Sequence, residues 1–134
     1  MLGCYKKKHT IPKLTIVMPI SNPCLFKRRE ELFGQCLDRL LKFSMNKKIN
    51  IVVSRLTYVT PLPDVNGITN RVTHNDGYTE LDFTAPDILW AKENLINLAI
   101  DWIIHNSPDT QYIAWIDSDI QFLNSDWIKK TLGV

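Results

Sequence analysis

Two aspartates separated by one residue, Asp117 and Asp119, directly follow an apolar run at residues 112–116. In extended backbone, alternate side chains point the same way, so we expect the two carboxylates to converge beyond this run. Two such anions repel each other and lose hydration near a core, and a divalent cation relieves both costs. Carboxylate oxygens suit Mg²⁺ or Mn²⁺, which leaves positions for water and phosphate oxygens. The spacing therefore predicts that Asp117 and Asp119 hold Mn²⁺ or Mg²⁺ against a diphosphate and neutralise its charge as it departs.

Three other structures can carry the same Asp-x-Asp spacing. Asp117 and Asp119 can be solvated turn residues that cap local amides, and this alternative stays open. An EF-hand loop that begins at Asp117 needs glycine at its sixth position and glutamate at its twelfth, where this chain has Phe122 and Ile128. A haloacid-dehalogenase-type phosphatase places the motif at the start of its fold, with catalytic residues far downstream, whereas this sequence ends at Val134. The last two schemes therefore fit poorly.

The elements that must position the aspartates alternate between strand and helix. Apolar, β-branched runs predict strands, and apolar residues at helical spacing predict helices. The predicted strands are residues 14–18, 49–59, 78–83 and 112–116, and the predicted helices are residues 26–43, 88–105 and 125–132. Residues 64–77 predict a loop, with a weak hairpin as the alternative, because they contain Asn-Gly and Asn-Asp-Gly turns. Strands joined through helices tend to lie parallel, so this order predicts an α/β fold with a mostly parallel sheet flanked by helices.

The carboxyl ends of the strands are where an open α/β sheet binds its ligand. The acidic triplet 117–119 lies at one such end, and the turn at residues 19–22 lies at another. Asn22 can cap the helix that follows, with Pro23 at its first position. Because residues 112–116 are nearly all apolar, we expect this strand, including Trp115, in the middle of the sheet. The alternating residues 78–83 are expected to form an edge-like strand.

Composition and charge describe one globular domain over residues 1–134. The net charge of +2 gives no reason to expect a nucleic-acid partner, and the three lysines at residues 6–8 are expected to form a solvated N-terminal arm over residues 1–12. Three cysteines without a CxxC pair predict reduced thiols in place of a disulfide framework or a zinc site. The sequence has no stretch of about 18 apolar residues and no secretory signal. We therefore expect no membrane span and a cytoplasmic location.

Three segments together resemble the nucleotide-binding half of GT-A-type glycosyltransferases. Residues 15–20 (TIVMPI) resemble the first strand and its nucleotide-facing turn, residues 90–99 (WAKENLINLA) the helix before the acidic motif, and residues 112–119 (YIAWIDSD) the strand with the DxD motif. The match extends from residue 14 to about residue 130. It implies a GT-A-like, Rossmann-type fold and a metal-dependent glycosyltransferase that uses a nucleotide-diphosphate sugar.

The resemblance also implies roles for individual residues. Asp119 would coordinate Mn²⁺ or Mg²⁺, Asp117 would contact the metal or the ribose, and Ser118 would lie beside the nucleotide-sugar. Six further residues would surround the nucleotide: the backbone of Pro19, Ile20 and Ser21 beside the nucleoside, Arg55 near the base, and Lys92 and Asn97 near the diphosphate. The family often has an acidic residue near the strand end where this chain has Ser54-Arg55.

The typical GT-A fold continues well past its DxD motif, with the acceptor site and, in inverting enzymes, the catalytic base. The resemblance therefore implies that the acceptor half is truncated here, and it assigns no catalytic residue. The acceptor (glycan, protein or lipid) and homo-oligomerisation stay open. A nucleotidyltransferase would have a glycine-rich basic loop after its first strand, whereas residues 19–23 contain no glycine. A non-catalytic nucleotide-binding or assembly module with a GT-A-like fold is the remaining alternative.

Overall fold

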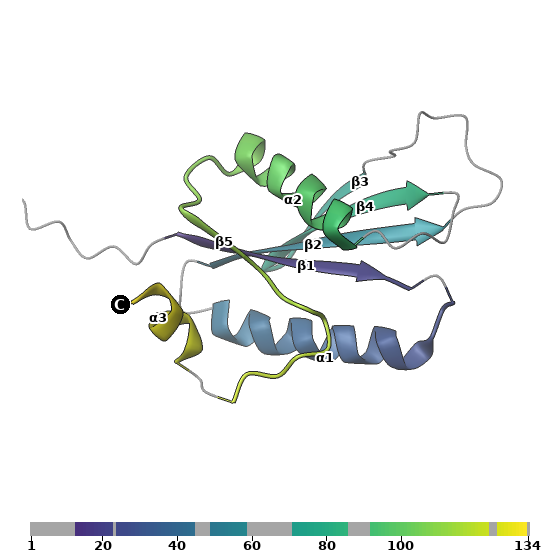
Figure 1. Cartoon of the computed structure of the whole chain (residues 1–134), viewed down its shortest axis with the longest axis horizontal. Helices are drawn as coiled ribbons and strands as arrows, with labels where there is room; N and C mark the ends of the chain where they lie inside the picture. Colours follow the sequence, from purple (N-terminus) through teal and green to yellow (C-terminus); the bar gives the residue numbers. More distant parts are fainter. Residues whose placement is uncertain are drawn as a thin grey trace, which may run out of the picture.

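The computed structural model of the chain describes residues 13–22, 24–44, 49–58, 71–85, 92–123 and 126–133. These residues form one sheet with helices on both faces (Figure 1). In chain order the elements are β1 (Leu14–Ser21), α1 (Lys27–Ser44), β2 (Ile49–Tyr58), β3 (Arg71–Asn75), β4 (Tyr78–Ala85), α2 (Lys92–Asn106), β5 (Tyr112–Trp115) and α3 (Trp127–Leu132). The predicted alternation of strand and helix is therefore present.

The sheet is mixed but mostly parallel. β1 pairs in parallel with β2 on one side and with β5 on the other, and β2 pairs in parallel with β4. β3 runs antiparallel to β4, and the strand order is β3-β4-β2-β1-β5. The prediction of an α/β fold with a mostly parallel sheet flanked by helices is confirmed.

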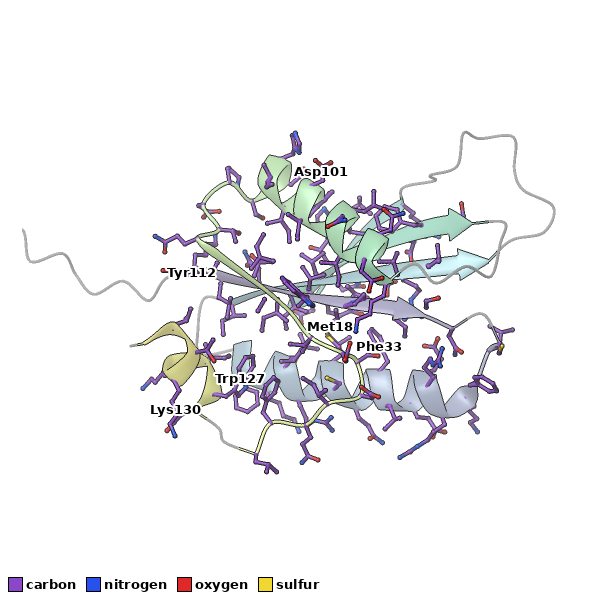
Figure 2. All side chains as sticks on the ribbon, in the orientation of Figure 1. Met18, Phe33, Asp101, Tyr112, Trp127 and Lys130 are labelled. Carbon is purple, nitrogen blue, oxygen red and sulfur yellow. The ribbon has the colours of Figure 1, made fainter. Side chains whose placement is uncertain are left out.

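Strand β1 is buried on both faces because its side chains alternate between two hydrophobic layers. Ile16 and Met18 belong to the layer that α1 and α3 cover, and Val17 belongs to the layer under α2. Figure 1 shows α1 and α3 on one side of the sheet and α2 on the other. In Figure 2, Met18 and Phe33 lie between the sheet and α1, whereas Asp101 lies on the outer side of α2. The core therefore consists of two layers that share β1.

Pro19 lies inside β1, although the sequence predicted that the strand would end before it. The amide of Ile116 donates to the carbonyl of Val17 at 3.0 Å, so the polar groups of Val17 face β5. By alternation, the nitrogen of Pro19 faces the same side, beyond the last residue pair between β1 and β5. Its missing N–H therefore costs no bond in the ladder, and β1 continues along β2 to Ser21.

Two predictions about the sheet edges are wrong. β5, which was expected in the middle, is an edge of the described sheet, and Trp115 is 58% exposed. Residues 78–83 were expected at an edge, but β4 lies between β2 and β3. The reason is that the weak hairpin forms: residues 71–75 pair with β4 across a tight turn in which Gly77 has a φ of 86°. A Cβ atom there would lie 2.8 Å from Leu41 of α1, so glycine fits both the backbone and the space.

Several predictions fall outside the described residues. These are the basic arm at residues 1–12, Pro23 at the start of the first helix, residue 59 of the second strand, residues 64–70 of the loop, residues 88–91 of the second helix, and the start of the third helix at residue 125. In the part of the chain that is described, no helix combines the length and the apolar character needed to cross a membrane.

Replacing Ile103 by alanine should destabilise the protein by about 2–5 kcal/mol, because the change leaves a cavity under α2. Ile103 is 1% exposed and packs in the layer between α2 and the sheet. The matched control is Ile104→Ala on the same helix, since Ile104 is 59% exposed. Urea unfolding of both variants measures the difference, and equal losses would contradict this packing.

Candidate functional site

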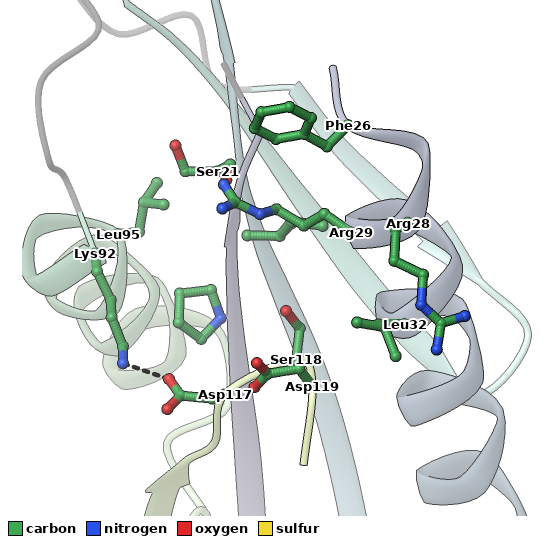
Figure 3. A pocket seen from close by; sticks show the side chains of 12 residues that line it. Ser21, Phe26, Arg28, Arg29, Leu32, Lys92, Leu95, Asp117, Ser118 and Asp119 are labelled. Atoms are coloured by element: carbon green, nitrogen blue, oxygen red, sulfur yellow. Dashed lines mark hydrogen bonds and ion pairs between the residues drawn. The ribbon is translucent and has the colours of Figure 1, made fainter. Parts of the chain in front are cut away.

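A cleft of about 560 Å³ lies at the carboxyl ends of β1 and β5, between the first turns of α1 and α2 (Figure 3). The residues that line it are Pro19, Ile20, Ser21, Phe26, Arg28, Arg29, Leu32, Lys92, Leu95, Asp117, Ser118 and Asp119. The structure therefore brings together seven of the nine residues predicted to form the site, all except Arg55 and Asn97.

The position of the cleft follows from the topology of the sheet. The connection from β1 through α1 leads to β2 on one side, whereas α2 leads to β5 on the other side of β1. These two helices cover opposite faces of the sheet (Figure 1). Such a switch leaves a crevice beyond the carboxyl ends of the two neighbouring strands, and open α/β sheets bind their ligands there.

The two aspartates leave the sheet through a turn. β5 ends at Trp115 and residues 118–119 form a turn, so the backbone is not extended through Asp119. Asp117 forms an ion pair with Lys92, drawn as a dashed line in Figure 3. Asp119 lies beside Ser118, on the side nearer α1, where its charge acts on Cys36. The predicted reason for convergence, an extended strand, is therefore wrong, although both carboxylates line the same cleft.

The charges at this turn allow only a limited set of metal ligands. Within the described ranges, no group of three or more His, Cys, Asp or Glu side chains is placed to hold one metal ion. A cation would therefore have Asp119, and Asp117 if Lys92 moves away, with water and ligand oxygens in its other positions. That is the usual coordination of Mg²⁺ at phosphate sites. The binding of Mg²⁺ or Mn²⁺ in this cleft therefore stays a prediction.

Helix α1 supports the acidic turn from one side. Arg39 donates a hydrogen bond to the carbonyl of Ile120 at 2.9 Å, and the Cys36 sulfur lies 4.0 Å from the carbonyl oxygen of Asp117. Burial raises the pKa of the Cys36 thiol above its ordinary value; Arg39 opposes this rise and Asp119 adds to it. The thiol is therefore protonated at neutral pH and serves as a small packing group.

Lys92 reaches the cleft because the first turn of α2 is anchored to the sheet. The buried hydroxyl of Ser54, on β2, donates a hydrogen bond to the carbonyl of Leu95 at 2.9 Å. This bond satisfies a hydroxyl that would be costly to bury alone, and it fixes the turn that carries Lys92. This role of Ser54 could not be predicted from the sequence, since its partner lies on a distant element.

The wall formed by α1 was not predicted from the sequence. Asn22 was predicted to cap this helix, but α1 begins only at Lys27, so that prediction is wrong. The side chain of Asn22 instead closes the loop before the helix: it accepts a hydrogen bond from the amide of Phe26 at 3.0 Å and donates to the Phe26 carbonyl at 2.9 Å. This reversal places Phe26, Arg28, Arg29 and Leu32 along the cleft. Asn22 was the available signal, because a polar turn residue directly after β1 predicts that the chain reverses there and that the next helix begins near the end of that strand.

Arg55 and Asn97 are not among the residues that line the cleft. Arg55 lies 3.2 Å from Glu30 and 3.3 Å from Glu80, with its guanidinium carbon 5.0 Å from the centre of the Phe33 ring. Burial alone would lower the pKa of Arg55, but the two carboxylates together raise it above its ordinary value. Arg55 therefore links α1 to β2 and β4. Asn97 is exposed on α2, and contacts of either residue with a base or diphosphate stay predictions.

Comparison with family models, with characterised proteins and with solved structures found no match to this chain.

Iodoacetamide should modify Cys36 at least about tenfold more slowly than Cys24 at pH 8, because Cys36 is buried with a raised thiol pKa and Cys24 is exposed. Mass spectrometry of peptides from partly alkylated protein gives both rates in one sample. Labelling in denaturant serves as the control, since it should equalise the two cysteines. Equal rates in the folded protein would show that α1 does not seal the acidic turn.

Proposed function

We propose that the cleft binds a nucleotide-diphosphate sugar together with Mn²⁺ or Mg²⁺, and that the chain is the donor-binding domain of a GT-A-like glycosyltransferase. The observation that supports this proposal most directly is the position of Asp117, Ser118 and Asp119. They lie at the carboxyl end of β5 and line one cleft with the end of β1. A charged diphosphate at a topological switch point is a common ligand of such sheets.

Each cleft residue has a distinct task in this proposal. Asp119 would bind the metal, and Asp117 would bind the metal or the ribose. Lys92 would leave Asp117 and approach the diphosphate, so that the lysine charge always faces an anion. Pro19 and Ser21 would border the nucleoside. The bound ion would supply neutralisation of the negative charge that develops on the departing diphosphate.

The ion pair between Lys92 and Asp117 favours a second candidate, a nucleotide-binding module without transferase activity. In that protein the lysine would remain on Asp117 and replace part of the metal's charge. Hydrolysis of a nucleotide-sugar by water, measured with Mn²⁺, separates the two candidates. Product formation that depends on Asp119 favours the enzyme, and binding without hydrolysis favours the module.

Removing the Asp119 carboxylate should abolish metal-dependent binding. Calorimetric titration with UDP and with GDP should show at least about tenfold tighter binding of one nucleotide in Mn²⁺ than in EDTA, and Asp119→Ala should remove this gain. Asp38→Ala is the matched control, because Asp38 is an exposed aspartate on α1 that does not line the cleft. Binding that is indifferent to metal and to Asp119 would end the proposal.

Replacing Lys92 by glutamine should have opposite effects on the metal and on the nucleotide. Mn²⁺ alone should bind about two- to fivefold more tightly, because Asp117 loses a partly exposed ion pair. UDP or GDP in Mn²⁺ should bind about tenfold more weakly, because the phosphates lose a cation. Electron paramagnetic resonance of free Mn²⁺ measures the first effect and calorimetry the second. If the affinities for Mn²⁺ and for the nucleotide changed in the same direction, the proposed move of Lys92 from Asp117 to the phosphates would be contradicted.

A further inference from the structure

Arg29 differs from the other cations that line the cleft, because it forms no ion pair with any carboxylate of the described residues. Lys92 pairs with Asp117, and Arg28 lies 3.6 Å from Glu31. In the described part of the chain, the contacts of Arg29 are with neutral groups only. Among the described residues, its positive charge therefore faces the cleft without a counter-charge.

The guanidinium of Arg29 is nevertheless held in place. It donates a hydrogen bond to the carbonyl of Ser21 at 2.9 Å, and its central carbon lies 5.9 Å from the centre of the Phe26 ring. A guanidinium has five N–H donors, so this anchoring leaves a fork of donors for a ligand. Figure 3 shows Arg29 extending from α1 across the cleft toward Ser21. These two contacts therefore orient the guanidinium of Arg29 without neutralising its positive charge.

The turn at residues 117–119 carries a negative charge that is also without an ion pair among the described residues. This charge belongs to Asp119, which does not pair with Arg29. An anion at Arg29 would satisfy the fork, because two parallel N–H groups match two oxygens of a phosphate. We propose that Arg29 binds a phosphate group of the ligand, and that this phosphate site operates without a metal ion.

This inference deepens the proposed function, and rests on it only for the identity of the nucleotide. The phosphate at Arg29 would be part of the diphosphate that the metal also contacts. The site itself requires only Arg29, its anchors and the open cleft. The metal and arginine contributions are therefore separable by experiment.

The test is calorimetric titration of the intact chain with inorganic pyrophosphate in EDTA. Arg29→Gln should weaken binding roughly 10- to 100-fold, because a charged hydrogen-bonding pair is lost. Arg29→Lys should give an intermediate loss, because the charge stays and the fork is lost. The matched control is Lys27→Gln, which removes an equal charge from an exposed residue two positions away that does not line the cleft. Thermal unfolding without ligand should be alike for all variants, since Arg29 is exposed.

The outcomes separate this inference from the proposed function. Pyrophosphate binding that depends on Arg29 but gains nothing from Mn²⁺ or Asp119 would support the phosphate site and reject the metal site. Nucleotide binding that depends on Mn²⁺ and Asp119 but not on Arg29 would do the reverse. Equal losses in Arg29→Gln and Lys27→Gln would overturn the inference, because they would indicate diffuse attraction between charges. Absence of pyrophosphate binding in EDTA would overturn it as well.

Discussion

The burial of β1 between two hydrophobic layers constrains the whole site. Ile16 and Met18 pack toward α1 while Val17 packs toward α2, so the two helices must lie on opposite faces of the sheet. Because neighbouring strands are reached through helices on different faces, the ends of β1 and β5 are left uncovered. Polar and charged side chains can collect there without disturbing the core. The cleft is thus a by-product of the way in which the central strand is buried.

The charged side chains in and near the cleft differ in how firmly they are paired. Arg55 is enclosed by Glu30 and Glu80 behind the cleft, where it connects elements of the framework. Lys92 and Asp117 are paired but partly exposed, so water and ligands can compete for them. Arg29 and Asp119 face the cleft with opposite charges and no mutual contact. A ligand that combines a cation with a phosphate would satisfy this arrangement better than a neutral molecule would.

The sequence predicted the elements well and their neighbours less well. Apolar periodicity identified α1 and β1, and Asn22 marked the reversal between them, because these signals are local. The place of β5 at an edge depends on whether any strand pairs beyond it, and an apolar run such as residues 112–116 carries no information about that. Asp117 and Asp119 were found by type and spacing, but their directions were not, because the turn at residues 118–119 replaced extended backbone. Ser54 and Arg29 were missed since their roles arise from partners on other elements.

Helix α1 joins the cleft to the opposite end of the molecule. Its first turn carries Arg29, and near its other end Leu41 packs against Gly77 of the hairpin turn. An 18-residue helix is about 27 Å long and behaves as a nearly rigid rod. The side chains of Phe33, Leu37 and Leu40 are buried against the sheet along this helix, so the position of Arg29 depends on packing that extends well beyond the cleft.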